Sequence, residues 1–214
     1  SPTTGFVLGF LLMGLLYFLL RHWRPMAVNK LFGKLQLLSS AYMGLSHGSN
    51  DAQKTMGIIA LALMTATGAG VFNELPGWLS FLKTPEPEAG QTLEIAVWIK
   101  VVCAMTMCAG TAAGGWRIIK TLGHKLVKLH PVHGFAAETT SASVLAVAAH
   151  FGMPVSTTHA ITSSIMGVGC AKGFNALRLN VVERIIWAWI LTIPASGIAA
   201  YLMVRFARAA GWIP

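Results

Sequence analysis

The sequence predicts an all-α, polytopic membrane protein, and three observations support this fold class. Hydrophobic residues make up 55% of the 214 residues and charged residues only 11%, with a mean hydropathy of +0.63. A soluble domain carries about 25% charged residues. Several apolar runs approach the roughly 20 residues that a helix needs to cross a bilayer core. Basic residues gather directly after such runs, as they do in cytoplasmic loops.

The net charge of +9, from 16 basic and 7 acidic residues, would suggest nucleic-acid binding in a soluble protein. Here the basic residues follow apolar runs, so we expect the lipid bilayer as a partner and no nucleic acid. The two basic clusters are Arg21, Arg24, Lys30 and Lys34, and Arg117, Lys120, Lys125 and Lys128.

The first half of the chain is expected to cross the membrane twice. The run 6–20 crosses once and ends at the first basic cluster. The longer run 35–72 is interrupted by the polar residues 48–51. Segment 73–91 holds prolines and acidic residues and is expected to be an external loop. Because the chain begins at Ser1 without Met, we interpret it as a piece of a longer polypeptide.

The second half begins with a predicted crossing at residues 93–115. Residues 116–130 alternate apolar residues at helical spacing with basic ones, which predicts an amphipathic helix along the cytoplasmic interface. The run 181–206 is the last predicted crossing. The segments belong to a single transmembrane domain, residues 1–214, with about four net crossings.

Residues 135–170 are predicted to form a re-entrant helical hairpin. Two apolar arms of about 16 residues flank Gly152-Met153-Pro154, and each arm is only ~24 Å long as a helix. That length is short for a full crossing. Irregular backbone survives at membrane depth only where it lines a cavity or is buried in protein.

A polar island, residues 46–54, interrupts the second apolar run. A charge at membrane depth is costly and marks a functional site by default, and Gly48 permits a broken helix there. Asn50, Asp51 and Gln53 supply the hard oxygen atoms that small cations prefer, and Asp51 can also carry a proton. The alternative is an ordinary interfacial loop with solvated polar residues.

A second polar island, residues 154–159, has the pattern of a helix start. Pro154 suits the first turn of a helix, and Ser156 can serve as its N-cap. The free N–H groups there, with the hydroxyls of Ser156, Thr157 and Thr158, form an anion cradle without a full positive charge. The alternative is that the hydroxyls bond back to the preceding turn. A cation from the first island would offset the charge of a bound oxyanion.

The motifs in these islands resemble those of the inorganic phosphate transporter (PiT) family, in its bacterial low-affinity type. Gly48-Ser49-Asn50-Asp51 matches the family's Gly-x-Asn-Asp signature, and residues 154–159 match its Pro-Val-Ser-Thr-Thr-His signature. Glu138-Thr139-Thr140 resembles the acidic segment that precedes the second signature. The order and spacing of these motifs match across residues 40–170.

The resemblance implies a transporter rather than an enzyme, with two inverted repeats that hold phosphate between them. This chain has one copy of each motif and is similar to the C-terminal half. The expected location is the plasma membrane, the inner membrane of a bacterium. The expected partners are phosphate and the N-terminal repeat of the same polypeptide or another copy in a homo-oligomer.

Matching by position gives roles to two groups of residues. Those that would contact phosphate are Ser156, Thr157, Thr158 and Gln53. Those that would serve the cation-linked part of the site are Asn50, Asp51 and Glu138. The coupling ion, Na⁺ or H⁺, takes the place of a cofactor, and the sequence does not choose between the two ions.

Alternatives remain at the level of sequence. The chain could belong to a permease for sulfate or another oxyanion, or be a non-transporting half that needs a partner. An intramembrane serine hydrolase built on Ser49 or Ser156 with a histidine is another alternative, but neither serine stands in a Gly-x-Ser-x-Gly elbow. Among His47, His133, His150 and His159, which lie in or beside apolar runs, no pair has the three- or four-residue spacing that places two zinc ligands on one helix face, so no transition-metal site is expected. Lys54 either offsets phosphate charge or extends its amine to the membrane interface.

Overall fold

Helices make up the regular structure of the chain. The computed structural model describes residues 1–73, 76–87, 94–120, 129–173 and 176–211, and in these ranges it contains helices and no strand. They are α1 (Pro2–Leu20), α2 (Pro25–Gly68), the 3-10 helix η1 (Gly77–Leu82), α3 (Val97–Lys120), α4 (Pro131–His150), α5 (Thr157–Lys172) and α6 (Leu179–Ala209). The predicted all-α fold class is confirmed.

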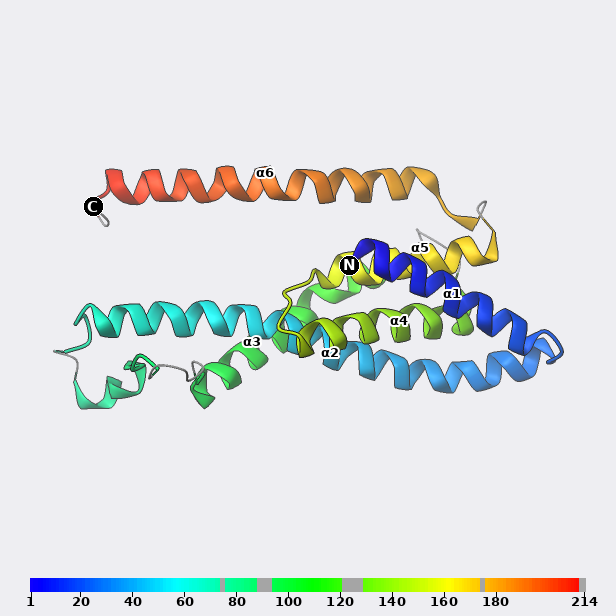
Figure 1. The fold of residues 1–214 in the computed structure, drawn as a ribbon, viewed down its shortest axis with the longest axis horizontal. Coiled ribbons are helices and arrows are strands. Elements are labelled where there is room, and N and C mark those ends of the chain that lie inside the picture. Colours follow the sequence, from blue (N-terminus) through cyan, green and yellow to red (C-terminus); the bar gives the residue numbers. More distant parts are fainter. Residues whose placement is uncertain (74–75, 88–93, 121–128, 174–175, 212–214) are drawn as a thin grey trace.

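Four of these helices, α1, α2, α4 and α5, pack into a bundle from which α3 and α6 extend (Figure 1). α1 lies against α5 and α4, and α2 lies against α4. A buried apolar cluster joins them, and its members are Met13, Phe32, Val132, Ala136, Ala137, Ile165, Met166 and Val168. The hairpin helices therefore form the centre of the described structure.

Small residues let α1 and α5 approach closely. A Cβ atom on Gly9 would lie 2.7 Å from the carbonyl oxygen of Ser164. A Cβ atom on Gly167 would lie 2.9 Å from the backbone nitrogen of Phe10 and would collide with the carbonyl oxygen of Phe6. Close backbone contact through small residues is how helices associate in a bilayer, where no hydrophobic effect drives them together.

α2 is one uninterrupted helix, so the predicted break at residues 48–51 is wrong. Its 44 residues extend about 66 Å, far more than one crossing of ~30 Å requires. Gly, Asn and Asp are weak helix formers, but each costs only about 1 kcal/mol or less in a helix interior. The buried Asn50 side chain finds a hydrogen-bond partner outside α2, so it does not compete with the helix for its own backbone.

α4 and α5 form a helical hairpin, with bounds slightly wider than the predicted 135–170. α4 ends in a Schellman motif, because the Met153 N–H donates to the carbonyl of Ala148 at 2.9 Å. Gly152 has φ +66° in this turn, a conformation that favours glycine. The re-entrant placement of the hairpin in a membrane stays a prediction.

Three helices are long and apolar enough to cross a membrane, namely Pro2–Leu20, Val97–Trp116 and Leu179–Ala209. They coincide with the predicted crossings at 6–20, 93–115 and 181–206. The interfacial helix predicted at residues 116–130 does not begin as a separate helix, because residues up to Lys120 continue α3. Its residues 121–128 lie outside the described part of the chain.

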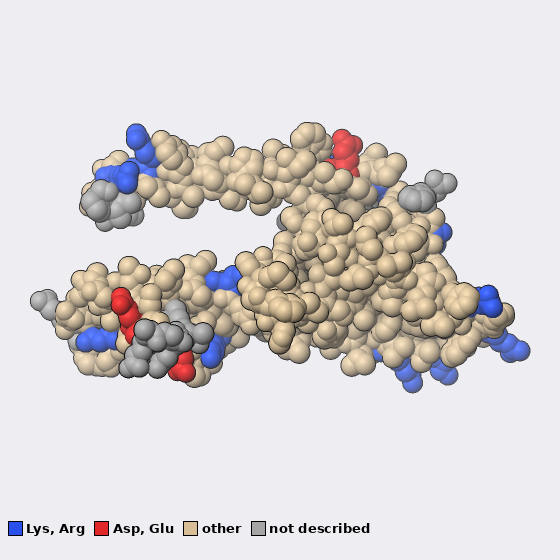
Figure 2. Space-filling model, in the orientation of Figure 1, with Lys and Arg blue, Asp and Glu red and all other residues tan. Residues whose placement is uncertain are grey.

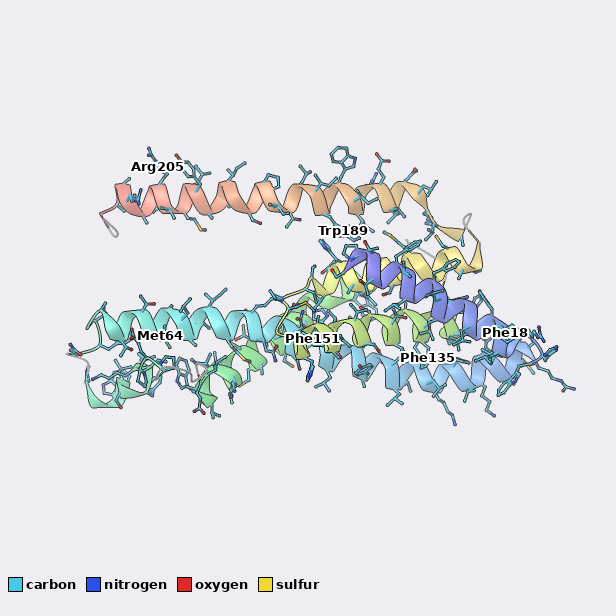
Figure 3. All side chains as sticks on the ribbon, in the orientation of Figure 1. Phe18, Met64, Phe135, Phe151, Trp189 and Arg205 are labelled. Atoms are coloured by element: carbon cyan, nitrogen blue, oxygen red, sulfur yellow. The ribbon has the colours of Figure 1, made fainter. Side chains whose placement is uncertain are left out.

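α6 stands apart from the bundle for most of its length (Figures 1 and 2). None of its residues is buried. Its first turns meet the bundle, where Val181, Val182 and Ile185 pack against the core cluster. Trp189 also lies close to the bundle (Figure 3), with its ring 4.4 Å, centroid to centroid, from the ring of His159 on α5. Beyond this point most of the large apolar side chains of α6 are exposed.

Candidate functional site

The two polar islands meet in space at the carboxylate of Asp51. The Thr157 hydroxyl, from the first turn of α5, donates to Asp51 Oδ2 at 3.0 Å. On α2, Lys54 Nζ lies 3.0 Å from Oδ1, and His47 Nε2 lies 3.2 Å from Oδ2. The three α2 residues share one helix face because they are spaced by three and four positions. One carboxylate therefore links the Asn-Asp motif to the Ser-Thr-Thr motif.

A backbone carbonyl at the hairpin tip makes the second link. The Val155 carbonyl oxygen accepts from Asn50 Nδ2 at 3.0 Å and from Lys54 Nζ at 2.6 Å. Val155 precedes the N-cap of α5, so its carbonyl is not used by that helix. Asn50 is 3% exposed, and a buried amide without a partner would be costly. This contact therefore holds the hairpin tip on α2.

The start of α5 has the predicted N-cap. The Ser156 hydroxyl accepts the His159 N–H at 3.3 Å, and the helix begins at Thr157. Pro154 was expected in the first turn but lies in the loop before the cap. The first N–H groups of a helix have no intrahelical partner, and Ser156 takes only that of His159. The N–H groups of Thr157 and Thr158 are thus available to an anion.

Gln53 borders a small cavity beside this cluster. The cavity has a volume of about 180 Å³, and residues from α2 and from the hairpin tip line it. The lining residues are Asn50, Gln53, Lys54, Ala149, Gly152, Met153 and Pro154. An amide, an ammonium group and the hairpin backbone therefore face one space next to the Asp51 cluster.

The side chains of Thr158 and Glu138, two further predicted site residues, lie apart from the Asp51 carboxylate. Thr158 is exposed, and no contact joins its side chain to Asp51 among the described hydrogen bonds. Glu138 accepts a hydrogen bond from the buried Ser39 at 2.5 Å, which joins α4 to α2. Ser39 precedes Asp51 by 12 residues on α2, about 18 Å along the helix axis. Glu138 therefore belongs to a separate polar contact.

Sequence reasoning missed two components of the cluster. The Val155 carbonyl carries no side-chain signal, although its position before a helix start is a hint that backbone oxygens face the site. His47 was considered only as a possible zinc ligand, and that role was rejected. In the structure it pairs with the Asp51 carboxylate at i, i+4 spacing. The amine of Lys54 contacts Asp51 and Val155, and Lys54 also lines the small cavity.

The arrangement offers oxygen ligands and hydrogen-bond donors in one place. Among the described residues, no group of three or more His, Cys, Asp or Glu side chains could hold a metal ion. The carboxylate of Asp51 and the carbonyl of Val155 are hard oxygens that a cation such as Na⁺ could share. The ammonium group of Lys54 now contacts both oxygens.

The fold and the site define a polytopic helical membrane protein with an ionic cluster held between its helices. A model of the phosphate transporter family matches residues 1–200. The chain therefore belongs to the phosphate transporter family, a family of transporters. The predicted location in the bacterial inner membrane, as a multi-pass protein, agrees with this family and with the apolar helices.

Individual relatives support the same assignment. A Rhizobium meliloti protein named "Probable low-affinity inorganic phosphate transporter" is 40% identical over 202 residues, which are 94% of this chain and 54% of that protein. A Bacillus subtilis protein of the same name is 36% identical over 208 residues, 96% of this chain and 56% of that protein. The chain thus spans about half the length of the curated relatives that it matches.

A solved structure titled "The sodium-dependent phosphate transporter" also resembles this chain. The two share 26% sequence identity with a TM-score of 0.66. The match covers 90% of this chain and 46% of the solved chain. The helix arrangement of this chain is therefore similar to about half of that transporter.

Proposed function

We propose that the complete protein transports inorganic phosphate across the plasma membrane together with a coupling cation. The bond between Thr157 and Asp51 is the observation that carries this proposal. It joins a donor-rich helix start to an oxygen-rich cluster, and these are the two chemistries that an anion and its counter-cation need. Membership of the phosphate transporter family supports phosphate as the anion.

Phosphate is assigned to the start of α5. The N–H groups of Thr157 and Thr158 and the hydroxyls of Ser156 and Thr158 are the donors that would bind its oxygens. The Thr157 hydroxyl would join them by releasing Asp51 Oδ2, because its single proton forms that bond in the structure. The positive end of the α5 dipole favours an anion there without a fixed charge. Gln53 would donate from α2 across the small cavity.

The cation is assigned to Asn50, Asp51 and the carbonyl of Val155. We favour Na⁺ over H⁺, because the oxygen donors suit a hard cation and because the similar solved structure is named as sodium-dependent. Na⁺ would displace the ammonium group of Lys54 from Asp51 and Val155. Charge balance would then couple the two ions, since a cation at Asp51 offsets the charge of phosphate beside it.

Glu138 receives a different role from that of a direct ligand. Its bond to Ser39 joins α4 to α2 about 18 Å from Asp51. It would support transport by fixing the position of the hairpin on α2.

The site is proposed to be completed by a second repeat. The chain carries one copy of each motif and spans about half the length of its relatives. The open faces of α3 and α6 are where an N-terminal inverted repeat of the same polypeptide, or another copy, would pack.

Uptake of labelled phosphate by cells or liposomes that contain the complete protein tests this function. We expect Asp51→Asn and Thr157→Val each to reduce uptake at least tenfold. Each substitution removes a hydrogen bond that involves a charged group, and such a loss costs about 1.4 kcal/mol or more, which is a factor of ten in affinity. Thr65→Val is the matched control, since its hydroxyl is exposed on α2 and bonds to the carbonyl of Leu61 in its own helix. Normal uptake in both well-expressed site variants would refute the proposal.

The same assay identifies the ions. Uptake driven in turn by a sodium gradient and by a proton gradient separates Na⁺ from H⁺ coupling. Competition between unlabelled sulfate and labelled phosphate then tests the anion. We expect stimulation by sodium and little competition by sulfate.

A further inference from the structure

A basic cavity lies at the opposite end of the bundle from the hairpin tip. Its volume is about 400 Å³, and it lies where α1 passes into α2 and where α4 begins. Asn29 on its wall precedes Asp51 by 22 residues on α2, about 33 Å along the axis. This cavity is therefore separate from the proposed transport site.

The polar lining of this cavity favours an anion. Arg21 and Lys172 supply two cations, and His130, His133, Tyr17 and Asn29 supply polar groups. Among the described residues that line it, none is Asp or Glu. The N-terminal turns of α2 and α4 also border it, at Pro25 and Val132, and the positive ends of their dipoles add to the field.

A chain of hydrogen bonds aims one donor into this cavity. The backbone N–H of His130 donates to His133 Nδ1 at 3.0 Å, so Nδ1 carries no proton. The proton of the neutral ring is then on Nε2, 2.9 Å from the Tyr17 hydroxyl oxygen. The Tyr17 oxygen therefore accepts from His133, and its own O–H is free to donate to a ligand.

The charge state of His133 agrees with this geometry. His133 lies in the first turn of α4, outside the apolar spans and before the predicted hairpin. Burial lowers the pKa of its imidazole, and the nearby charges of Lys172 and His130 lower it further. The ring is neutral at neutral pH, as the Tyr17 bond requires.

The surroundings of the cavity favour a lipid over a free ion. Leu15, Phe18 and Leu19 are 52%, 62% and 57% exposed on α1, next to its end at the cavity. Arg21 lies over the ring of Phe18, 4.9 Å from its centroid, so its charge adjoins this apolar surface. Trp23 lines the cavity and is exposed, as expected of an aromatic residue at the membrane interface. Acyl chains would lie along α1 while a headgroup occupies the cavity.

We propose that this cavity binds the phosphodiester headgroup of an anionic phospholipid, with Arg21 and Lys172 as the charged contacts and Tyr17 as a hydrogen-bond donor. Basic residues at this end predict a cytoplasmic orientation, and the cytoplasmic leaflet carries the anionic lipids. Basic pockets between helices on that side are suited to such headgroups.

Binding of short-chain phosphatidylglycerol to the purified complete protein tests the proposal, with thermal stabilisation as the readout. The double variant Arg21→Gln/Lys172→Gln is expected to bind at least tenfold more weakly, because it removes both charge-assisted hydrogen bonds to the phosphodiester. Tyr17→Phe removes one donor and no charge, and is expected to weaken binding about fivefold.

The control variant Lys30→Gln/Lys34→Gln removes the same charge from exposed residues that do not line the cavity. It is expected to bind phosphatidylglycerol within twofold of the unchanged protein. An equal loss in both double variants would show general electrostatic attraction and overturn the proposal. Equal stabilisation by phosphatidylcholine would also overturn it, and so would stabilisation by inorganic phosphate that depends on Arg21 and Lys172.

Discussion

At the scale of single residues, Lys54 occupies the position of a cation in the site. Its ammonium group contacts the Asp51 carboxylate and the Val155 carbonyl, one oxygen from each polar island. A coupling ion at Asn50 and Asp51 would have to displace it. Lys54 thus sets how much of the Asp51 charge is available to an external cation.

Replacement of Lys54 tests this competition. In Lys54→Gln, the carboxylate of Asp51 loses its internal cation, so Na⁺ is expected to bind about two- to fivefold more tightly, in line with a partly exposed ion pair. The sodium concentration for half-maximal phosphate uptake should fall by this factor. Lys34→Gln is the control, because Lys34 is exposed on α2 and lies 17 residues before Asp51. If the sodium concentration for half-maximal uptake rises or stays constant in Lys54→Gln, Lys54 and Na⁺ do not compete for Asp51.

The residues of the site were predictable to different degrees. Asp51 and Thr157 could be recognised because ionisable and hydroxyl groups within apolar runs stand out, and the structure brings them within 3.0 Å of each other. The Val155 carbonyl could not, because every residue has one and only the fold selects it. The position of Glu138 depends on how α4 lies along α2, which a motif alone does not specify.

At the scale of helices, the contact between α1 and α5 depends on glycine. Gly9→Ala is expected to destabilise the protein by about 1–3 kcal/mol, because its Cβ would lie 2.7 Å from the Ser164 carbonyl oxygen and the backbones must separate. Thermal unfolding followed by size-exclusion fluorescence measures the change.

Gly14→Ala on the same helix is the matched control. A Cβ atom there would meet nothing within 4 Å, so the variant gains helix propensity and is expected to be unchanged or up to about 1 kcal/mol more stable. The two substitutions are chemically identical and differ only in what faces them. Equal effects would mean that α1 and α5 do not pack as described.

The helices themselves were largely predictable from apolar run length and turn residues. The hairpin follows from two short arms around Gly152, and Gly152 is indeed the residue with φ +66° after α4. The break predicted in α2 was wrong because local propensity is weak compared with packing. Asn50 and Asp51 are tolerated within the helix because α5 and its preceding loop supply their partners.

At the scale of the whole molecule, α3 and α6 expose most of their surface outside the described bundle. α6 has no buried residue, and the span Val97–Trp116 of α3 is only 11% buried. We expect liposomes that contain only residues 1–214 to show background phosphate uptake, and liposomes with the full-length protein to show robust uptake. Restoration of uptake by the N-terminal half, supplied as a separate chain, would support a site shared between repeats. Full activity of this chain alone would contradict it.

The unbroken course of α2 has a mechanical consequence. Asn29 and Asp51 sit 22 residues apart on one helix, and a rod of ~33 Å displaces its far end by about 0.6 Å for each degree of tilt. Asp51 is held to the hairpin tip by the hydrogen bond from the Thr157 hydroxyl. Asn50 and Lys54 are held there by their hydrogen bonds to the Val155 carbonyl. α2 is therefore a continuous rod, and we expect a displacement at its N-terminal end to move the Asp51 carboxylate, because no hinge lies between them to absorb it.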